Sequence, residues 1–129
     1  ALSADQRSRV QIINSNVLNP ELPKADCVVA MNFSYFIFKT RAALRSYFEN
    51  CYRRLNAGGV LICDCFGGSN TLQCIEEETE VEDHDFSFFW DQEWLDPINN
   101  FSQFHIHFQP KGDKKYEKVF SYEWRMWSI

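Results

Sequence analysis

One stretch of the sequence, residues 25–63, restricts the fold more than any other. It opens with an unbroken apolar run over 27–31, which lacks the alternation of a half-exposed strand and is typical of a strand covered on both faces. Thr40 then offers a helix N-cap, and apolar residues recur after it at helical spacing. Gly58 and Gly59 can end that helix, and a second apolar run follows over 60–63. The pattern predicts one βαβ unit with two parallel strands.

The rest of the chain has a different pattern. Its aromatic-rich runs are separated by Pro, Gly, Asn and Asp residues typical of turns, and they span residues 86–95, 101–108 and 116–127. We expect these runs to form an antiparallel meander. The acidic run over 76–80 is interpreted as a solvated loop or a short helix. The predicted class is therefore α/β, as a single domain over 1–129 with an α/β part (1–68) and a part with the acidic loop and antiparallel strands (69–129).

Composition excludes several classes of protein. Hydrophobic residues make up 45% of the 129 residues, which argues against disorder. The net charge of -5 gives no electrostatic reason to expect duplex nucleic acid or an anionic membrane as partner. No apolar run approaches the length of about 20 residues that a membrane span needs. The cysteines number five and lie mostly in apolar or helical segments, without zinc-site spacing, so we expect a cytoplasmic protein with reduced thiols and no metal.

Three segments stand in a distinctive order. They are RVQIINSNVL (9–18), with an expected short strand over 10–13, then ADCVVAMNFSY (25–35), and then LNAGGVLICD (55–64). Their order and spacing resemble the second half of the catalytic domain of class I S-adenosylmethionine-dependent methyltransferases. The resemblance implies a partial doubly wound, Rossmann-like sheet. It also implies a parent enzyme that transfers a methyl group from S-adenosylmethionine to a small molecule or a protein side chain, with S-adenosylhomocysteine as product.

The sequence departs from this family in one important respect. No G-x-G-x-G segment follows a strand, although that loop normally lets the backbone approach the cofactor. The family also places its first two strands between the third and the fourth, so the strand over 27–31 is expected to have an unpaired edge. We therefore expect this chain to be part of a larger parent domain. We expect the chain by itself to form a homodimer through the exposed sheet edge, or a rearranged strand pairing.

Ligands of open α/β sheets bind beyond the carboxyl ends of the strands, which locates the candidate site. The expected cofactor contacts are Asn16, Val17, Asn32, Phe33 and Ser34. Asp64 is a candidate catalytic residue, because it can orient a substrate amine or accept a proton; the alternative is a strand-end carboxylate bonded to nearby backbone. The expected substrate contacts are Tyr35, Phe66, Trp90 and Glu93.

Two groups in the meander also suggest chemistry. His105 and His107 face the same side of a strand, but no third ligand lies within sequence reach, so we interpret them as solvent-facing pairing residues rather than metal ligands. The tryptophans could form a cage for a cation, although core packing across the meander is the better interpretation; they are Trp90, Trp94, Trp124 and Trp127.

Two alternatives to methyl transfer remain open. The first is a non-catalytic, degenerate methyltransferase module that acts in dimerisation or regulation, which the missing glycine loop favours. The second is an aromatic-lined ligand-binding protein built on the meander alone, which predicts an all-β fold.

Overall fold

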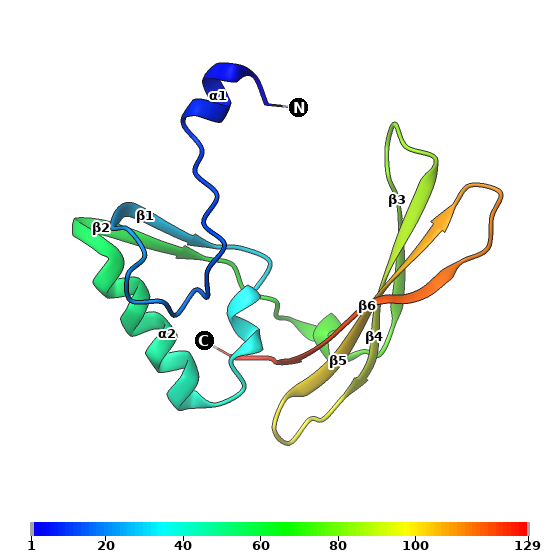
Figure 1. The fold of residues 1–129 in the computed structure, drawn as a ribbon. Coiled ribbons are helices and arrows are strands. Elements are labelled where there is room, and N and C mark those ends of the chain that lie inside the picture. Colours follow the sequence, from blue (N-terminus) through cyan, green and yellow to red (C-terminus); the bar gives the residue numbers. More distant parts are fainter. Residues whose placement is uncertain (1, 129) are drawn as a thin grey trace.

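A computed structural model describes residues 2–128, and the βαβ unit expected over 25–63 is present in it (Figure 1). Strand β1 (Ala25–Ala30) leads through the 3₁₀ turn η1 (Ser34–Ile37) into helix α2 (Arg41–Arg54), which returns to strand β2 (Leu55–Cys63). The two strands pair in parallel, as predicted. A βαβ unit is incompatible with the all-β alternative, so that hypothesis is wrong.

Local chemistry explains where this unit begins and turns. The Thr40 side chain accepts a hydrogen bond from the Ala43 amide at 3.1 Å, which confirms the predicted N-cap. The helix ends earlier than predicted, at Arg54, so Gly58 and Gly59 lie inside β2. A Cβ atom at Gly59 would lie 2.9 Å from the carbonyl oxygen of Asp26, so glycine is needed where the two strands approach closely.

The aromatic runs form the predicted antiparallel meander. Four strands pair in sequence order: β3 (Glu76–Glu80), β4 (Phe86–Leu95), β5 (Phe101–Pro110) and β6 (Tyr116–Arg125). The prediction of a loop or short helix over the acidic run was wrong, because this run is β3 and pairs with β4. Its glutamates are all exposed, as suits the edge strand of a sheet.

The strand expected over residues 10–13 is absent. The chain passes from the short helix α1 (Ala4–Ser8) through irregular backbone to β1, and Ile12 is 91% exposed. The residue types favour a strand, but no described strand lies beside this segment to pair with it. Tertiary pairing, rather than local propensity, therefore decides its conformation.

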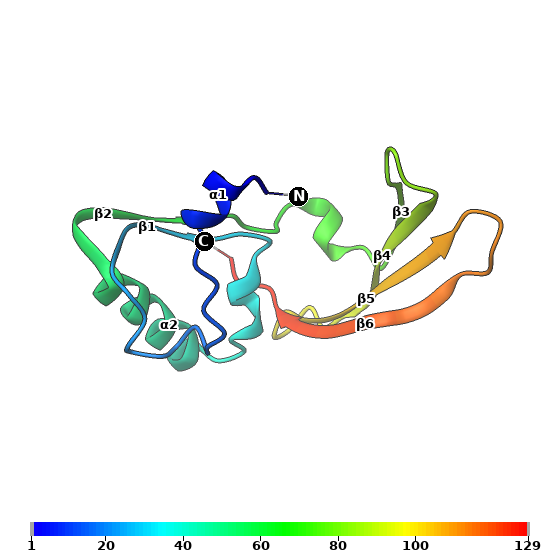
Figure 2. The ribbon, with the colours of Figure 1, turned by 45° about the horizontal axis from the view of Figure 1, so that its top comes forward.

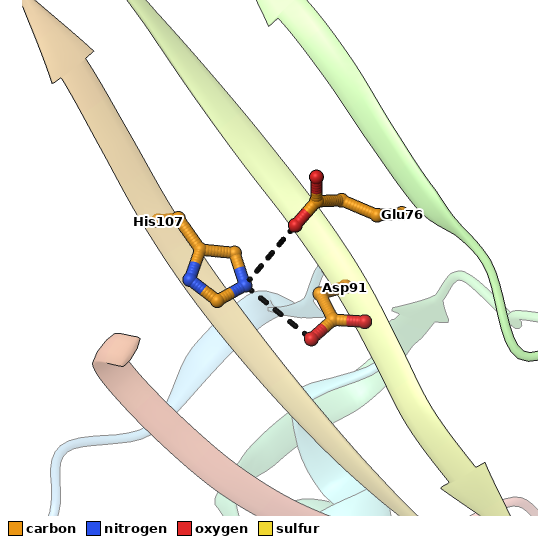
Figure 3. A group of neighbouring side chains, drawn as sticks. All are labelled: Glu76, Asp91 and His107. Atoms are coloured by element: carbon orange, nitrogen blue, oxygen red, sulfur yellow. Dashed lines mark hydrogen bonds and ion pairs between the residues drawn. The ribbon is translucent and has the colours of Figure 1, made fainter. Parts of the chain in front are cut away.

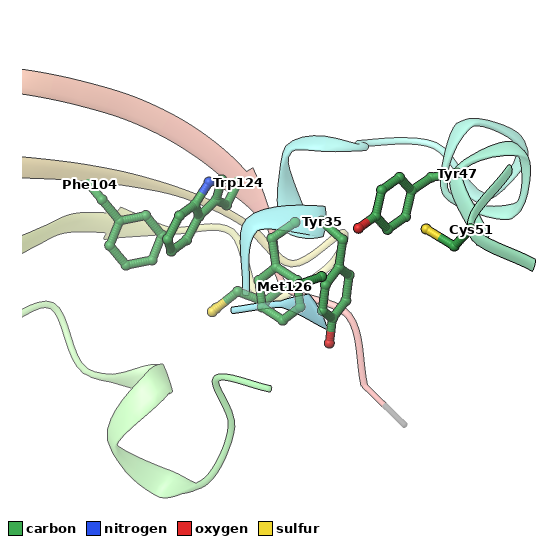
Figure 4. Packing of buried hydrophobic residues seen from close by; sticks show 8 residues of the cluster. Tyr35, Tyr47, Cys51, Phe104, Trp124 and Met126 are labelled. Atoms are coloured by element: carbon green, nitrogen blue, oxygen red, sulfur yellow. The ribbon is translucent and has the colours of Figure 1, made fainter. Parts of the chain in front are cut away.

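One buried cluster joins the α/β part to the meander (Figure 4). Phe36 of η1 and Phe104 of β5 are both fully buried. At the end of β6 the chain returns toward η1, as the turned view shows (Figure 2), so that Trp124 and Met126 pack between the two parts. The cluster consists of Ala30, Tyr35, Phe36, Tyr47, Cys51, Phe104, Trp124 and Met126.

The cysteines and helices add two simple findings. All five cysteines are free thiols, and Cys51 is the buried one. Among residues 2–128, no helix combines the length and apolarity that crossing a lipid bilayer requires.

Candidate functional site

The carboxyl ends of β1 and β2 meet at one edge of the sheet, where Asp64 holds the turn that follows β1. Its carboxylate accepts two backbone hydrogen bonds, from the amide of Asn32 at 2.7 Å and from the amide of Phe33 at 2.7 Å. Both of these residues adopt left-handed backbone, with φ of 55° and 42°. Such conformations are costly for residues other than glycine and persist where the surroundings hold them. Asp64 is therefore a strand-end carboxylate bonded to nearby backbone, which was the alternative to a catalytic role.

Tyr35 supports the same strand end from inside the core. Its side chain is 8% exposed, and its hydroxyl donates to the carbonyl oxygen of Asp64 at 2.9 Å. Burial, followed by the neighbouring Cys65, raises the pKa of the Tyr35 hydroxyl to about 12. The side chain is thus a neutral core group that braces the turn, whereas the sequence suggested a substrate contact.

Aromatic rings connect this turn to the meander. The Phe33 ring lies 5.2 Å from the ring of Phe66, which in turn lies 5.0 Å from Trp90. Trp90 stacks on Phe104 at 5.0 Å, and its indole N–H donates to the Tyr122 hydroxyl at 2.9 Å. We call the whole group the aromatic wall; it comprises Phe33, Phe66, Trp90, Phe104, Tyr122 and Trp124. The structure thus brings together Phe33, an expected cofactor contact, with Phe66 and Trp90, which were expected substrate contacts.

Two other predicted cofactor contacts, Asn16 and Val17, lie in an exposed turn before β1, whereas the exposed Ser34 begins η1 after it. The Asn16 side-chain oxygen accepts from the Leu18 amide at 2.8 Å, which shapes the turn. The turn is tied to α2 because the side-chain amide of Asn50 donates to the carbonyl of Val17 at 2.9 Å. Sequence reasoning missed Asn50, which is 9% exposed; the available signal was an amide beside the apolar position Cys51 on the helix.

Glu93 is separated from the other predicted substrate contacts. Phe104 and His105 are neighbours on β5 and therefore point to opposite faces of the sheet. Glu93 lies on the His105 face, where its carboxylate meets His105 Nε2 at 3.0 Å and bonds the Lys118 ammonium. These hydrogen bonds, first from Lys118 and then from His105, lower the pKa of Glu93 to about 2. The structure therefore groups Glu93 with an ion-pair network, away from the aromatic wall.

The two histidines on this face are buried, so the prediction that they face solvent was wrong. His105 is 5% exposed and His107 is 4% exposed, because long charged side chains from neighbouring strands cover them. The ring of His105 also contacts the Ser121 hydroxyl at 2.7 Å, so both of its nitrogens have partners.

His107 belongs to the one group in residues 2–128 that offers three metal-ligand atoms, together with Glu76 and Asp91 (Figure 3). Its Nδ1 accepts the backbone N–H of Lys118 at 2.8 Å, so in the neutral ring the proton lies on Nε2. Nε2 faces Asp91 at 3.3 Å and Glu76 at 3.5 Å. A metal ion at Nε2 would have to displace that proton while Nδ1 stays an acceptor. The group is therefore better described as a polar cluster in which His107 on β5 lies against Asp91 on β4 and Glu76 on β3.

The Glu93 network predicts a specific pH dependence. A carboxylate with a depressed pKa stabilises the fold above its ordinary pKa of about 4.3, and that contribution is lost as pH falls. We expect Glu93→Gln to lower the free energy of unfolding at neutral pH and to have a vanishing effect as pH falls toward about 2. Urea denaturation across this range measures the difference. In a Lys118→Met background the effect of Glu93→Gln should shrink; an unchanged effect would contradict the assigned cause.

Three solved structures share this fold. An S-adenosylmethionine-dependent methyltransferase from Clostridium acetobutylicum ATCC 824 matches with a TM-score of 0.69 and 18% identity, over 94% of this chain and 50% of its own. The CcbJ methyltransferase from Streptomyces caelestis matches with a TM-score of 0.63 and 16% identity, over 88% of this chain and 45% of its own. The sugar N-methyltransferase KedS8 from Streptoalloteichus sp ATCC 53650 matches with a TM-score of 0.64 and 14% identity, over 97% of this chain and 53% of its own.

These matches concern the fold. The chain spans about half the length of each of the three solved structures. No family model matches the sequence, and no curated protein matches it either. The parallel strand pair followed by an antiparallel meander is thus an arrangement that this protein shares with part of a methyltransferase fold.

Proposed function

We propose that this chain forms part of an S-adenosylmethionine-dependent methyltransferase, within a larger doubly wound parent domain. In this proposal the carboxyl ends of β1 and β2 form one side of the methyl-donor site. The observation that carries it is the turn held by Asp64, which lies against the aromatic wall at the edge of the sheet where α/β proteins bind ligands. The fold shared with three methyltransferase structures supports the same proposal.

The residues at these strand ends fit one side of S-adenosylmethionine. The cofactor needs hydrogen-bond partners for its nucleoside and a surface that tolerates a sulfonium cation, which aromatic ring faces attract. The exposed Asn32 and Ser34 offer polar groups beside Phe33 at the end of β1. In this proposal Asn16, in the exposed turn before β1, offers the second lone pair of its side-chain oxygen to the adenine amino group. The sequence contains no glycine-rich loop after a strand, so the proposed fit covers only this side of the cofactor.

The chain's own residues then align and shield the reacting groups. When bound, S-adenosylmethionine supplies a methyl group already activated by its sulfonium. Phe66 and Trp90 would exclude water and orient the methyl acceptor. Asp64 would act as a positioning residue, since its carboxylate oxygens hold the turn on which Asn32 and Phe33 lie. We propose a small molecule or a protein side chain as acceptor; KedS8, a sugar N-methyltransferase, supports the small-molecule class.

Isothermal calorimetry with S-adenosylhomocysteine tests the proposal. We expect the chain to bind this product, and Asn16→Ala to weaken binding about fivefold through the loss of a hydrogen bond worth about 1 kcal/mol. Phe120→Ala, at a 60% exposed position on β6, is the matched control and should bind like the wild type. An absence of binding both by this chain and by a longer chain that includes the proposed parent domain would contradict a methyl-donor site here.

One observation favours a second candidate function. The missing glycine-rich loop supports a non-catalytic, degenerate methyltransferase module that acts in dimerisation or regulation. This candidate predicts no response to S-adenosylhomocysteine from either the chain or the longer chain, so the two titrations together separate it from the enzyme.

A further inference from the structure

One polar atom beside the aromatic wall has no partner. Gln92 of β4 pairs with Phe104 of β5, so both side chains belong to one face of the meander, which we call the wall face. Gln92 is 1% exposed, and its Nε2 donates to the carbonyl oxygen of Thr71 at 2.8 Å. Its Oε1 is buried and accepts no hydrogen bond from residues 2–128. A buried acceptor without a donor costs free energy, so this atom indicates a ligand that carries one.

A short segment covers the Gln92 amide. The 3₁₀ turn η2 (Ser69–Leu72) follows Gly68, whose φ of 108° is a conformation that glycine adopts without cost. The buried residue of η2 is Thr71, whereas Leu72 is 65% exposed. A segment with so few buried side chains can open locally at a small cost in free energy. Opening η2 frees the Gln92 amide on the wall face.

The wall face is suited to molecules without negative charge. In the four strands of the meander, lysine and arginine occur only at Lys118 and Arg125. Lys118 bonds Glu93 on the opposite face, and Arg125 points away from the wall because it follows Trp124. The strand register instead places a carboxylate on the wall face, that of Glu77. Aromatic ring faces and a carboxylate repel anions, so this face favours a neutral or cationic ligand.

We propose that Gln92 is a specificity-determining residue for the methyl acceptor, and that this acceptor is an apolar amine whose N–H donates to Gln92 Oε1. The inference rests on the proposed methyl transfer. The apolar body of the amine packs on Trp90, which lies two positions along the same strand and therefore on the same face.

An amide is the suitable partner for such an amine. It accepts an N–H bond from the neutral form and leaves the nitrogen lone pair free, whereas a carboxylate would favour the ammonium form, which has no lone pair. In the transfer the nitrogen lone pair forms the N–C bond, and the C–S bond breaks with its electrons going to sulfur. The product ammonium then releases its proton to water.

A ligand is a better partner for Oε1 than a fixed group of the parent domain. This chain's own residues already bury the atom, so a permanent neighbour could reach it only if η2 were always open. Thr71 would then lose its bond from Gln92 for good. A ligand requires η2 to open only during turnover, so the closed arrangement remains the resting state.

Two matched probes test the proposal: aniline and N,N-dimethylaniline. Both are uncharged at neutral pH, and only aniline carries N–H groups. They are titrated into the longer chain that includes the parent domain, in the presence of S-adenosylhomocysteine, while the NMR shift of the Trp90 indole N–H is followed. We expect aniline to bind about fivefold tighter, which corresponds to one hydrogen bond, and Gln92→Met to abolish this preference. A preference that survives in Gln92→Met, or benzoate binding as tightly as aniline, overturns the proposal.

Two further variants separate the acceptor atom from a structural effect. Gln92→Glu keeps an acceptor oxygen and should retain the preference for aniline, which also serves if Gln92→Met fails to fold. Gln103→Met is the matched control, because Gln103 lies on β5 but on the opposite face, where its Nε2 donates to the Tyr122 carbonyl at 3.1 Å. It should behave like the wild type.

The affinity for S-adenosylhomocysteine distinguishes this inference from the proposed function. We expect Gln92→Met to bind this product as the wild type does. Binding of the product together with an unchanged probe preference would overturn the role of Gln92 alone. A longer chain that binds no product would count against methyl transfer itself.

Discussion

Replacing Phe104 by alanine is expected to lower the free energy of unfolding by about 3–5 kcal/mol, because it leaves a large cavity in a fully buried position. The Phe104 ring is 0% exposed and packs against Trp90, Tyr122 and Trp124. Urea denaturation followed by tryptophan fluorescence measures the loss. The matched control is Phe120→Ala, at a 60% exposed position, which should change stability by no more than about 0.5 kcal/mol. Equal effects of the two variants would contradict this placement of the core.

The same variant tests whether the two parts of the chain unfold together. Since the buried cluster draws residues from η1, α2 and the meander, helix content and tryptophan fluorescence should be lost in one transition. In Phe104→Ala both signals should move to lower urea by the same amount. Two separate transitions would mean that residues 1–68 and 69–129 are independent units.

Changing Asp64 to asparagine is expected to lower the free energy of unfolding by about 2–4 kcal/mol, since each hydrogen bond to a charged group contributes about 1.5–3 kcal/mol. The variant keeps one acceptor oxygen, but it sets an NH₂ group against an amide N–H of Asn32 or Phe33. Asp26→Asn is the control, because Asp26 is exposed and its carboxylate accepts from the Asn56 side chain at 2.8 Å. Urea denaturation of both variants makes the comparison.

A rescue variant separates positioning from a purely chemical role for Asp64. Glycine adopts positive φ without cost, so adding Asn32→Gly to Asp64→Asn should recover about 1 kcal/mol of the lost stability. Amide resonances of residues 32 and 33 should shift in Asp64→Asn and leave the meander unaffected. An Asp64→Asn variant as stable as the wild type would contradict the positioning role and favour a proton acceptor.

Elements with a strong local signal could be predicted from the sequence. Helix α2 has an N-cap at Thr40 and an apolar stripe, and both act within a few residues of chain. Acidic β3 had no such signal, because charged residues favour a loop until a neighbouring strand offers its backbone groups. The prediction over 10–13 was wrong in the opposite sense, because a strand was expected and none formed. The residues there favour a strand, but no described strand lies beside them to pair with.

The candidate site, too, could be predicted from the sequence only in part. The rule that ligands bind beyond strand ends located the turn at Asn32 and Phe33 and the residue Asp64, because strand order along the chain determines which ends share an edge. It could not show that Asp64 bonds the backbone of that turn, nor that Glu93 lies on the face opposite Phe104. Both depend on contacts between residues more than ten positions apart in sequence.

By itself, the sequence determined the βαβ unit and the meander, and it indicated the edge of the sheet that we propose as the ligand site. Those features follow from periodicity, capping and turn residues, which act over short distances along the chain. Only the tertiary structure decided the burial of His105 and His107, the joining of Phe33, Phe66 and Trp90 into one wall, and the exposure of Val29 and Val60. Burial and exposure are properties of what packs against a residue, and packing is decided by partners distant in sequence.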